Sequence, residues 1–242
     1  MDKKQLHQAE YYAQQAAGYD ARWKRENPNH LYKIAEIARC FDELLAPGAG
    51  GHDFLEVGGG TGIHARQFLA THGPKVRSFV LSDLSPDMLA QARLRIGERP
   101  NVEYLVSPGE SLGTSKRFDG IYVSSAMHHF SRPRASIAEM RDHLNPGGVL
   151  VVCEPIVWNP LNLARAATMR EDWGQFVVTR SHVRCWLAEQ GMRVRVDRVL
   201  HWKGQGIAET LWPYDHLERI RALDPLAVMF LLAATADQAT VR

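Results

Sequence analysis

The chain has 242 residues, of which 45% are hydrophobic, and this composition suffices for one sizeable core. Its 29 Lys and Arg residues nearly balance its 27 Asp and Glu residues, so no block of like charge indicates a nucleic-acid partner. The first residues lack the apolar segment of a secretion signal, and no apolar run is long enough for a membrane span, so we expect a cytoplasmic protein.

Residues 6–46 have the pattern of two helices separated at Asn27-Pro28-Asn29. The first helix carries several aromatic residues, and the second has apolar residues at the spacing of a core-facing helix. Residues 47–51 are rich in Pro and Gly, which predicts the end of the second helix and a turn into the first strand.

From residue 53 onward, short apolar segments that predict strands alternate with helical segments. We expect strands at 53–57, 76–81, 102–106, 118–124, 149–153 and 192–200, and helices at 63–71, 86–96, 133–144 and 181–190. Such alternation is typical of a single α/β domain with a mostly parallel sheet covered by helices on both faces.

Three segments have no clear period. Residues 156–179 and 203–223 are irregular and aromatic, and we expect them to form a roof over a substrate. Residues 226–234 are apolar and fit either a short buried helix or a final strand, of which we favour the strand.

The first strand ends in Glu56, and Gly58, Gly59, Gly60 and Gly62 follow within a few residues. Glycines leave the backbone bare where the strand turns into a helix, so that a ligand can lie against the main chain. The unpaired N–H groups and the dipole of the helix start favour a negatively charged group. This pattern predicts a nucleotide-like cofactor.

Two cofactors fit these residues. The pattern Gly60-x-Gly62-x-x-Ala65, with Asp83 about 20 residues further on, matches a dinucleotide site. The helical segment ahead of the first strand argues against it, because a dinucleotide fold usually opens with that strand. An S-adenosylmethionine site also requires an acid, a glycine turn and a second acid.

Four segments in order resemble the motifs of class I S-adenosylmethionine-dependent methyltransferases, namely residues 56–62, 81–89, 118–130 and 144–150. They are similar to the small-molecule branch that includes the ubiquinone, sarcosine and natural-product enzymes, a UbiE-like or type 11 group. The resemblance implies a Rossmann-like seven-stranded sheet, an N-terminal helical lid (1–46), a cofactor-binding core (53–155) and a region of substrate roof and C-terminal strands (156–242).

The resemblance also implies how the methionine and ribose parts of the cofactor lie. Gly58, Gly60 and Gly62 would line the methionine part, and Glu56 would lie beneath its amino group. Asp83 would accept hydrogen bonds from both ribose hydroxyls, since an ionised carboxylate only accepts.

For the adenine, the resemblance implies that Leu84 and Met88 enclose the ring. The acid that the family often has after the third strand is replaced here by Pro108. Adenine recognition then falls to Glu110 or to the backbone, unless Glu110 is only a helix-start acid. Ser124, at the end of the fourth strand, is the remaining candidate for a cofactor contact.

Methyl transfer is an in-line displacement, so the enzyme aligns the two reactants, excludes water and, for a hydroxyl, removes a proton. His129 aligns with the histidine that serves as base in similar small-molecule enzymes, and His128 is the second candidate. The alternative is transfer by proximity alone, with both histidines structural. Three widely spaced cysteines without CxxC spacing indicate free thiols, and we predict no metal site.

Tyr19, followed by Asp20, matches the pattern by which the family's lid closes over the cofactor carboxylate. The remaining candidates are residues expected to contact the substrate, with Arg165 able to bind a carboxylate or phosphate: Tyr11, Tyr12, Trp158, Arg165 and Trp173. Arg165 otherwise lies in solvent, and the tyrosines otherwise dock an amphipathic helix on the sheet.

We therefore predict S-adenosylmethionine-dependent methyl transfer to an oxygen or nitrogen of a small, partly apolar metabolite, by a monomer or homodimer. The alternatives are an NAD(P)-dependent oxidoreductase and an S-adenosylmethionine-binding cyclase or regulatory protein that transfers no methyl group. The acceptor itself is not determined by the fold.

Overall fold

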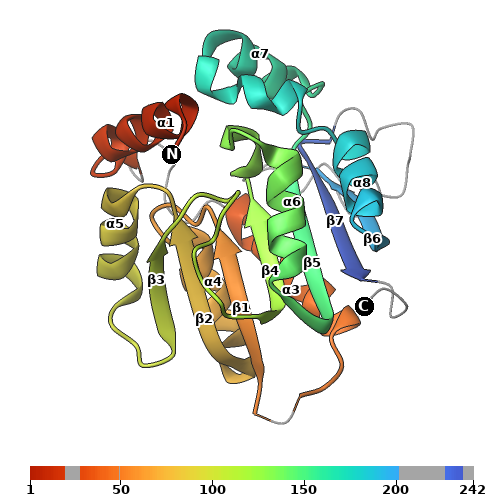
Figure 1. Cartoon of the computed structure of the whole chain (residues 1–242). Coiled ribbons are helices and arrows are strands. Elements are labelled where there is room, and N and C mark those ends of the chain that lie inside the picture. Colours follow the sequence, from red (N-terminus) through yellow and green to blue (C-terminus); the bar gives the residue numbers. More distant parts are fainter. Residues whose placement is uncertain (20–27, 49, 202–226, 237–242) are drawn as a thin grey trace.

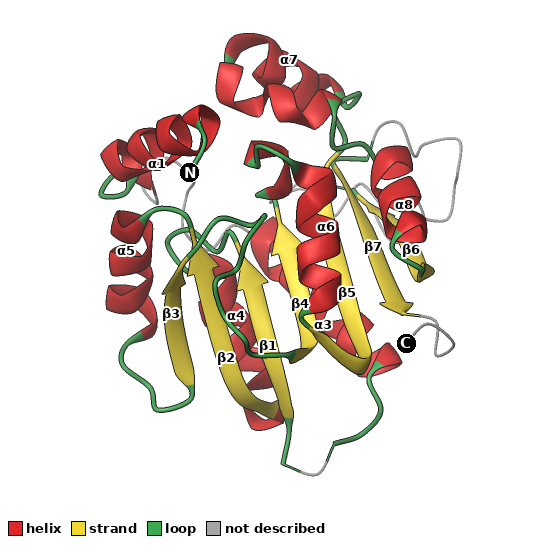
Figure 2. Cartoon of the chain, in the orientation of Figure 1, coloured by secondary structure: helices red, strands yellow, loops and turns green. Residues whose placement is uncertain are grey.

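A computed structural model describes residues 1–19, 28–48, 50–201 and 227–236. Within these residues, seven strands form one sheet in the order β3-β2-β1-β4-β5-β7-β6 (Figures 1 and 2). The strands are β1 (His52–Val57), β2 (Val76–Asp83), β3 (Val102–Val106), β4 (Phe118–Ser124), β5 (Leu144–Pro155), β6 (Met192–Leu200) and β7 (Met229–Ala236). The predicted mostly parallel, seven-stranded sheet is confirmed.

The last strand, β7, lies between β5 and β6 and runs antiparallel to both. The prediction of a strand rather than a helix near the end of the chain is therefore confirmed, with bounds shifted toward the C-terminus. The aromatic segment 203–223, expected to form part of the roof, lies outside the described residues. Strands β6 and β7 pair in register over most of their length.

Helices cover both faces of the sheet (Figure 1). One face carries α3 (Pro28–Leu44), α4 (Ile63–His72) and α5 (Pro86–Ile96), and the other carries α6 (Pro133–Asp142) and α8 (Arg180–Glu189). Ser85 caps α5 by accepting a hydrogen bond from the backbone of Met88, and Pro86 lies in the first turn.

Segment 156–179, predicted to be irregular, contains the helix α7 (Pro160–Thr168) and the 3₁₀ segment η3 (Arg170–Phe176). Asn159 caps α7 by accepting from the backbone of Leu161, and Pro160 occupies the first position. This Asn-Pro start is a helix signal, but the exposed, mixed composition that follows hides the period.

Two apolar clusters hold the sheet between its helices. On one face Phe54 and Tyr122 pack with Phe41 of α3 and Phe68 of α4, with a ring separation of 5.1 Å between Phe41 and Phe54. The opposite face of β1 contributes Leu55 and Val57 to the second cluster. Both faces of the sheet are therefore buried, as is typical of parallel sheets.

The parallel strands all end at one edge of the sheet. Because β1 pairs with β2 on one side and β4 on the other, connections on the two sides of β1 leave in opposite directions and open a crevice there. The helix α1 (Lys3–Gln15) and α7 lie over this edge (Figure 1). Among the described residues, no helix has the length and apolar content needed to cross a membrane.

Candidate active site

The turn from β1 into α4 lies at the floor of the crevice. Gly60 has a φ of 55°, and its missing side chain leaves open space above the backbone. Gly62 has a different role: it is the N-cap of α4, and a Cβ there would lie 2.9 Å from the Cβ of Ala92 in α5. Gly62 therefore allows α4 and α5 to pack closely. It is not among the residues that line the two cavities described below, and its contact with the methionine part stays a prediction.

Asp83, the last residue of β2, faces the crevice. Its Oδ2 accepts a hydrogen bond of 2.8 Å from the backbone N–H of Gly60, and its Oδ1 accepts one of 2.9 Å from that of Ser85. Burial raises the pKa of this carboxyl group, and the backbone donors oppose that rise. Since each carboxylate oxygen accepts more than one hydrogen bond, both atoms retain capacity for a ligand.

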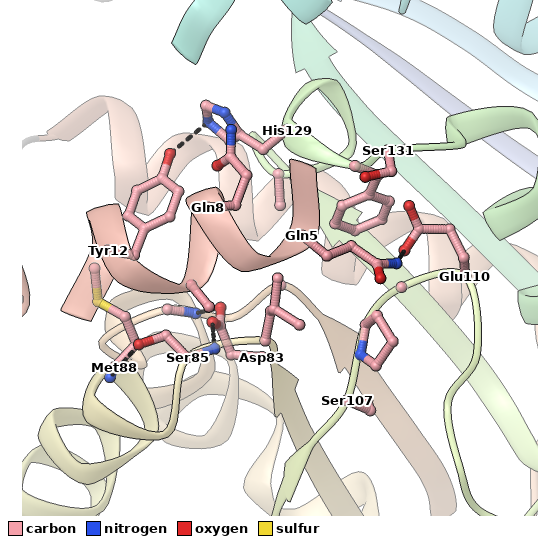
Figure 3. A pocket seen from close by; sticks show the side chains of 18 of the residues that line it. Gln5, Gln8, Tyr12, Asp83, Ser85, Met88, Ser107, Glu110, His129 and Ser131 are labelled. Atoms are coloured by element: carbon pink, nitrogen blue, oxygen red, sulfur yellow. Dashed lines mark hydrogen bonds between the residues drawn. The ribbon is translucent and has the colours of Figure 1, made fainter. Parts of the chain in front are cut away.

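A first cavity lies between Asp83 and α1 (Figure 3). Leu84 and Met88 lie on one side, and Pro108, Gly109 and the ring of Phe130 also line it. A Cβ at position 109 would lie 2.4 Å from the Phe130 ring, so only glycine leaves room for the ring at this place. The result is a slot with apolar walls and an acid at one end.

Glu110 lines the first cavity, but both of its oxygens have protein partners. Oε1 accepts from the backbone N–H of Arg132 at 2.9 Å, at the start of α6, and Oε2 accepts from Nε2 of Gln5 at 3.1 Å. This geometry favours the helix-start interpretation of Glu110. Ser107 is a residue that the sequence interpretation missed: its buried Oγ has no hydrogen-bond partner among the described residues, and it lines the same cavity.

Glu56 is buried beneath the glycine turn and lines neither cavity, which differs from its expected contact with the cofactor. Its Oε2 accepts a hydrogen bond of 3.0 Å from the Tyr122 hydroxyl. Burial raises the pKa of Glu56 to about 8, an effect that the Tyr122 hydrogen bond and the charge of Lys33 partly oppose. Its carboxyl group thus supports the turn from below.

A second cavity continues from the first beyond the glycine turn. The two share Tyr19, Gly58, Gly60, Ser125 and His129, so they meet at the ends of β1 and β4. The second cavity is lined mainly by polar side chains, among them His30, Lys33, His64, Ser124, His128, Asn162, Arg165 and Gln175. The two cavities adjoin, and the first contains an apolar slot whereas the second has mostly polar side chains. This arrangement can hold two reactants side by side.

His128 is held between two carboxylates. Its Nδ1 lies 2.5 Å from Oε2 of Glu154, and its Nε2 lies 3.6 Å from Oδ1 of Asp172. Burial alone would lower the pKa of His128, but the two carboxylates outweigh burial and raise it. Held between these carboxylates, His128 fastens the η2 turn (Met127–His129), and its predicted role as the second candidate for the base stays a prediction.

His129, unlike His128, has a neutral ring. Its Nδ1 lies 3.1 Å from the backbone oxygen of Glu171, which only accepts, so Nδ1 carries the proton. Nε2 then has the lone pair and accepts a hydrogen bond of 2.9 Å from the Tyr12 hydroxyl. Burial, and next the charge of His128, lower the pKa of His129 well below its ordinary value. A neutral imidazole thus directs a lone pair into the site.

The different environments of the two histidines predict a pH-dependent stability. The folded-state pKa of His128 lies above its unfolded value, so its stabilising effect is present below pH 6.5 and is lost as pH rises through the folded pKa. We expect His128→Ala to lower the free energy of unfolding by roughly 3 kcal/mol at pH 6, because it leaves the buried carboxylate of Glu154 without its cationic partner, and by less at pH 9. Urea unfolding at the two pH values measures this.

The control for this experiment is His182→Ala, since His182 is exposed. An equal loss of stability at both pH values for His128→Ala would contradict the imidazolium assignment.

His128, His129 and Asp172 are also close enough to hold a metal ion, with one ligand atom from each within 4.8 Å of the others. Asp172, however, forms an ion pair with Arg165, and His128 lies between carboxylates. The hydrogen bonds and ion pairs of the protein account for this cluster, and we assign no metal to it.

The remaining substrate candidates divide into two groups. Tyr12 and Arg165 line the cavities, whereas Tyr11 only packs edge-on against Tyr12, at 5.2 Å between ring centres. Trp158 and Trp173 are 64% and 56% exposed and line neither cavity. Tyr11, Trp158 and Trp173 thus lie outside the two cavities, and their predicted substrate contacts stay predictions.

The helix α1 closes the first cavity from above, as the predicted lid would (Figure 3). Hydrogen bonds along its length fasten it: Ser131 Oγ donates to Asp2 at 2.9 Å, Lys4 Nζ donates to the Phe130 backbone oxygen at 2.6 Å, and Gln5 and Tyr12 bind Glu110 and His129 as described. Tyr19 lines both cavities, and burial raises its pKa to about 12; its neighbour Asp20 lies outside the described residues.

These observations define a class: an α/β protein with a Rossmann-like sheet that has a glycine turn and a buried acid at the carboxyl edge of its strands, the place where such folds bind nucleotide-like ligands. Comparison with known proteins narrows this class. Residues 54–148 match the family model described as methyltransferase domain.

Among curated proteins, the chain is similar to the demethylmenaquinone methyltransferase of Tropheryma whipplei, with 34% identity over 135 residues, covering 56% of this chain and 48% of the relative. It is also similar to the ubiquinone/menaquinone biosynthesis C-methyltransferase of Cupriavidus taiwanensis, with 31% identity over 143 residues, covering 56% of this chain and 54% of the relative. The similarity thus spans about half the length of these relatives.

Among solved structures, the N-methyltransferase NodS of Bradyrhizobium japonicum WM9, in complex with S-adenosyl-L-homocysteine, has the same fold. The TM-score is 0.64 at 17% identity, with 93% of this chain and 96% of NodS covered.

Residues 54–148 therefore match a methyltransferase domain, as the four motifs predicted. The methyl donor of such enzymes is S-adenosylmethionine, which favours it over the dinucleotide as the cofactor at the glycine turn.

Proposed function

We propose that this chain binds S-adenosylmethionine across the junction of the two cavities and transfers its methyl group to an oxygen or nitrogen of a small molecule in the second cavity. The ribose hydroxyls would bind Asp83, the adenine would lie in the slot formed by Leu84 and Met88, and the methionine part would lie over Gly58 and Gly60. The observation that supports this most is His129, whose Nε2 lone pair faces the place where the cavities meet.

The chemistry required of the protein is limited to alignment, exclusion of water and removal of a proton. The lid helix α1 excludes water, the glycine turn and Asp83 position the donor, and His129 accepts the proton of an acceptor hydroxyl or amine through Nε2. Tyr12, which donates to this atom in the closed arrangement, would yield its place to the acceptor.

The second cavity indicates the kind of acceptor. Its lining combines Pro155 and Ile63 with amide side chains of Asn162 and Gln175, which fits a small molecule with several hydrogen-bonding groups. The Cupriavidus taiwanensis relative is named for carbon methylation and NodS for nitrogen methylation, so the acceptor atom is not a common property of the fold.

We further propose one domain for residues 1–242, with the lid at 1–46, the cofactor-binding core at 53–155 and the substrate roof with the C-terminal strands at 156–242. We also propose a cytoplasmic monomer or homodimer without a nucleic-acid partner, and the nearly balanced charge supports the last of these points.

The experiment that tests the proposal combines binding and product analysis. We expect calorimetry to show binding of S-adenosylhomocysteine and none of NAD(P)H, and methyl-labelled S-adenosylmethionine to label a small molecule in a metabolite extract. Binding of only NAD(P)H would instead identify an oxidoreductase. Turnover whose product has gained no methyl group would identify a cyclase and contradict the proposal.

A further inference from the structure

Gln175, in the 3₁₀ segment η3, is a buried amide at the second cavity. Only 2% of the residue is exposed, and its Oε1 has no hydrogen-bond partner among the described residues. Burying an amide oxygen without a hydrogen bond costs free energy, so nearly all such atoms in folded proteins are paired. The unpaired oxygen of Gln175 therefore indicates a partner that the described chain does not supply.

Most of the unpaired buried atoms of this kind lie at the two cavities. Within the described residues, six buried side-chain atoms lack a partner, and four of them line a cavity: those of Gln8 and Ser107 the first, and those of Ser124 and Gln175 the second. The proposed function gives the first cavity to the adenosine of the methyl donor. Gln175, which lines only the second cavity, is thus left for the methyl acceptor.

Other polar side chains of the second cavity have partners within the protein. Asn162 donates through Nδ2 to two backbone oxygens, at 2.9 and 2.8 Å, and Arg165 forms an ion pair with Asp172. These side chains hold the walls of the cavity together. Gln175 Oε1, by contrast, lies at the cavity without a described donor to accept from.

Contacts with the η2 turn determine where Gln175 lies. Asp172 Oδ1 is 3.6 Å from Nε2 of His128, and a Cβ at Gly174 would lie 1.6 Å from the backbone oxygen of His128. The segment η3 therefore packs directly against η2, and Gln175 follows this contact in the chain. Since His129 lines both cavities and Gln175 only the second, the amide lies beyond the junction where the methyl group would be transferred.

We infer that Gln175 binds the methyl acceptor, with Oε1 accepting a hydrogen bond from a hydroxyl or amine N–H that is not the group methylated. This inference rests on the proposed function, in which His129 takes the proton of the reacting group. An ether or carbonyl oxygen cannot pair with Oε1, because both only accept. The acceptor class is therefore a small molecule with at least two donor groups, such as a diol or an amino alcohol.

The test uses the acceptor that methyl-labelled S-adenosylmethionine labels in a metabolite extract, and analogues of it that each lack one other hydroxyl or N–H group. We expect the wild-type kcat/KM for the acceptor to exceed that for one of these analogues by about 10- to 100-fold, the range for leaving a buried oxygen unpaired. Gln175→Met, which keeps the length of the side chain without its carbonyl oxygen, should lower kcat/KM for the acceptor by a similar factor, mainly through KM, and remove the preference.

Two measurements separate this role from a structural one. Gln67→Met is the matched control, because Gln67 also has a buried, unpaired Oε1 but lines neither cavity, and it should keep the wild-type kcat/KM. Calorimetry should show that Gln175→Met binds S-adenosylhomocysteine with wild-type affinity. Because the substitution removes an unpaired polar atom from the interior, we expect thermal unfolding to show a variant at least as stable as wild type.

A Gln175→Met variant with wild-type kcat/KM for the acceptor would overturn the inference and leave only water as the partner of Oε1. Equal wild-type kcat/KM for the acceptor and all of its analogues would overturn it without any variant. Loss of S-adenosylhomocysteine affinity in Gln175→Met would also overturn it, because Gln175 would then belong to the donor site. Absence of any labelled small molecule with the wild-type protein would instead overturn the proposed function.

Discussion

Asp83→Ala is expected to abolish measurable binding of S-adenosylmethionine and S-adenosylhomocysteine, a loss of at least about 100-fold. The substitution removes the acceptors for two ribose hydroxyls, and charged hydrogen bonds are among the stronger ones. It also removes the acceptor for the backbone N–H groups of Gly60 and Ser85, which the carboxylate holds at 2.8 and 2.9 Å. The glycine turn thus loses its support at the same time.

Calorimetry with S-adenosylhomocysteine measures this effect, and Asp87→Ala is the matched control, because Asp87 is an exposed acid in the first turn of α5. Asp83→Asn retains one acceptor oxygen and should bind with intermediate affinity. Unchanged affinity of a folded Asp83→Ala variant would contradict the assignment of the ribose site.

His129→Ala is expected to lower kcat by about 100-fold or more, the usual contribution of a general base. The orientation of the ring supports this expectation, since Nδ1 is held by Glu171 and Nε2 has the lone pair. Tyr12→Phe, which removes the lid hydroxyl but leaves the imidazole, should have a much smaller effect on kcat. Transfer of labelled methyl groups to the extract measures both.

The pH dependence distinguishes a base from a residue that only packs. Because burial and His128 lower the pKa of His129, the base remains neutral below pH 6.5, and the wild-type rate should stay constant as pH falls through this value. A His129→Ala variant with near wild-type turnover would leave alignment of the reactants as the mechanism.

Much of the fold follows from local patterns. Buried strands in a parallel sheet are short apolar runs, and the run from Phe54 to Val57 has this form because helices cover both of its faces. The place of β7 between β5 and β6 has no such local signal, since it depends on pairing between strands that are distant in the chain.

Site residues could be predicted from the sequence only where they belong to a contiguous motif. Asp83 and Gly60 lie in contiguous motifs, and the structure brings them within hydrogen-bonding distance. Adjacent His128 and His129 look equivalent in the sequence, yet their states depend on residues more than twenty positions away, such as Glu154 and Glu171. The same reason hides Gln175, whose place at the second cavity depends on how η3 packs against the η2 turn.

The hydrogen bond between Tyr12 and His129 links the position of α1 to the charge on the imidazole. Enclosure under the lid disfavours a proton on Nε2, and by reciprocity a proton on Nε2 disfavours enclosure. Without an acceptor the neutral ring accepts the Tyr12 hydrogen bond and helps to hold the helix down. Once an acceptor has taken the place of Tyr12 and given its proton to Nε2, the ring can no longer accept from Tyr12, so this contact would re-form only after the base has lost the proton. Proton uptake would then time the departure of both products, and water would reset the base.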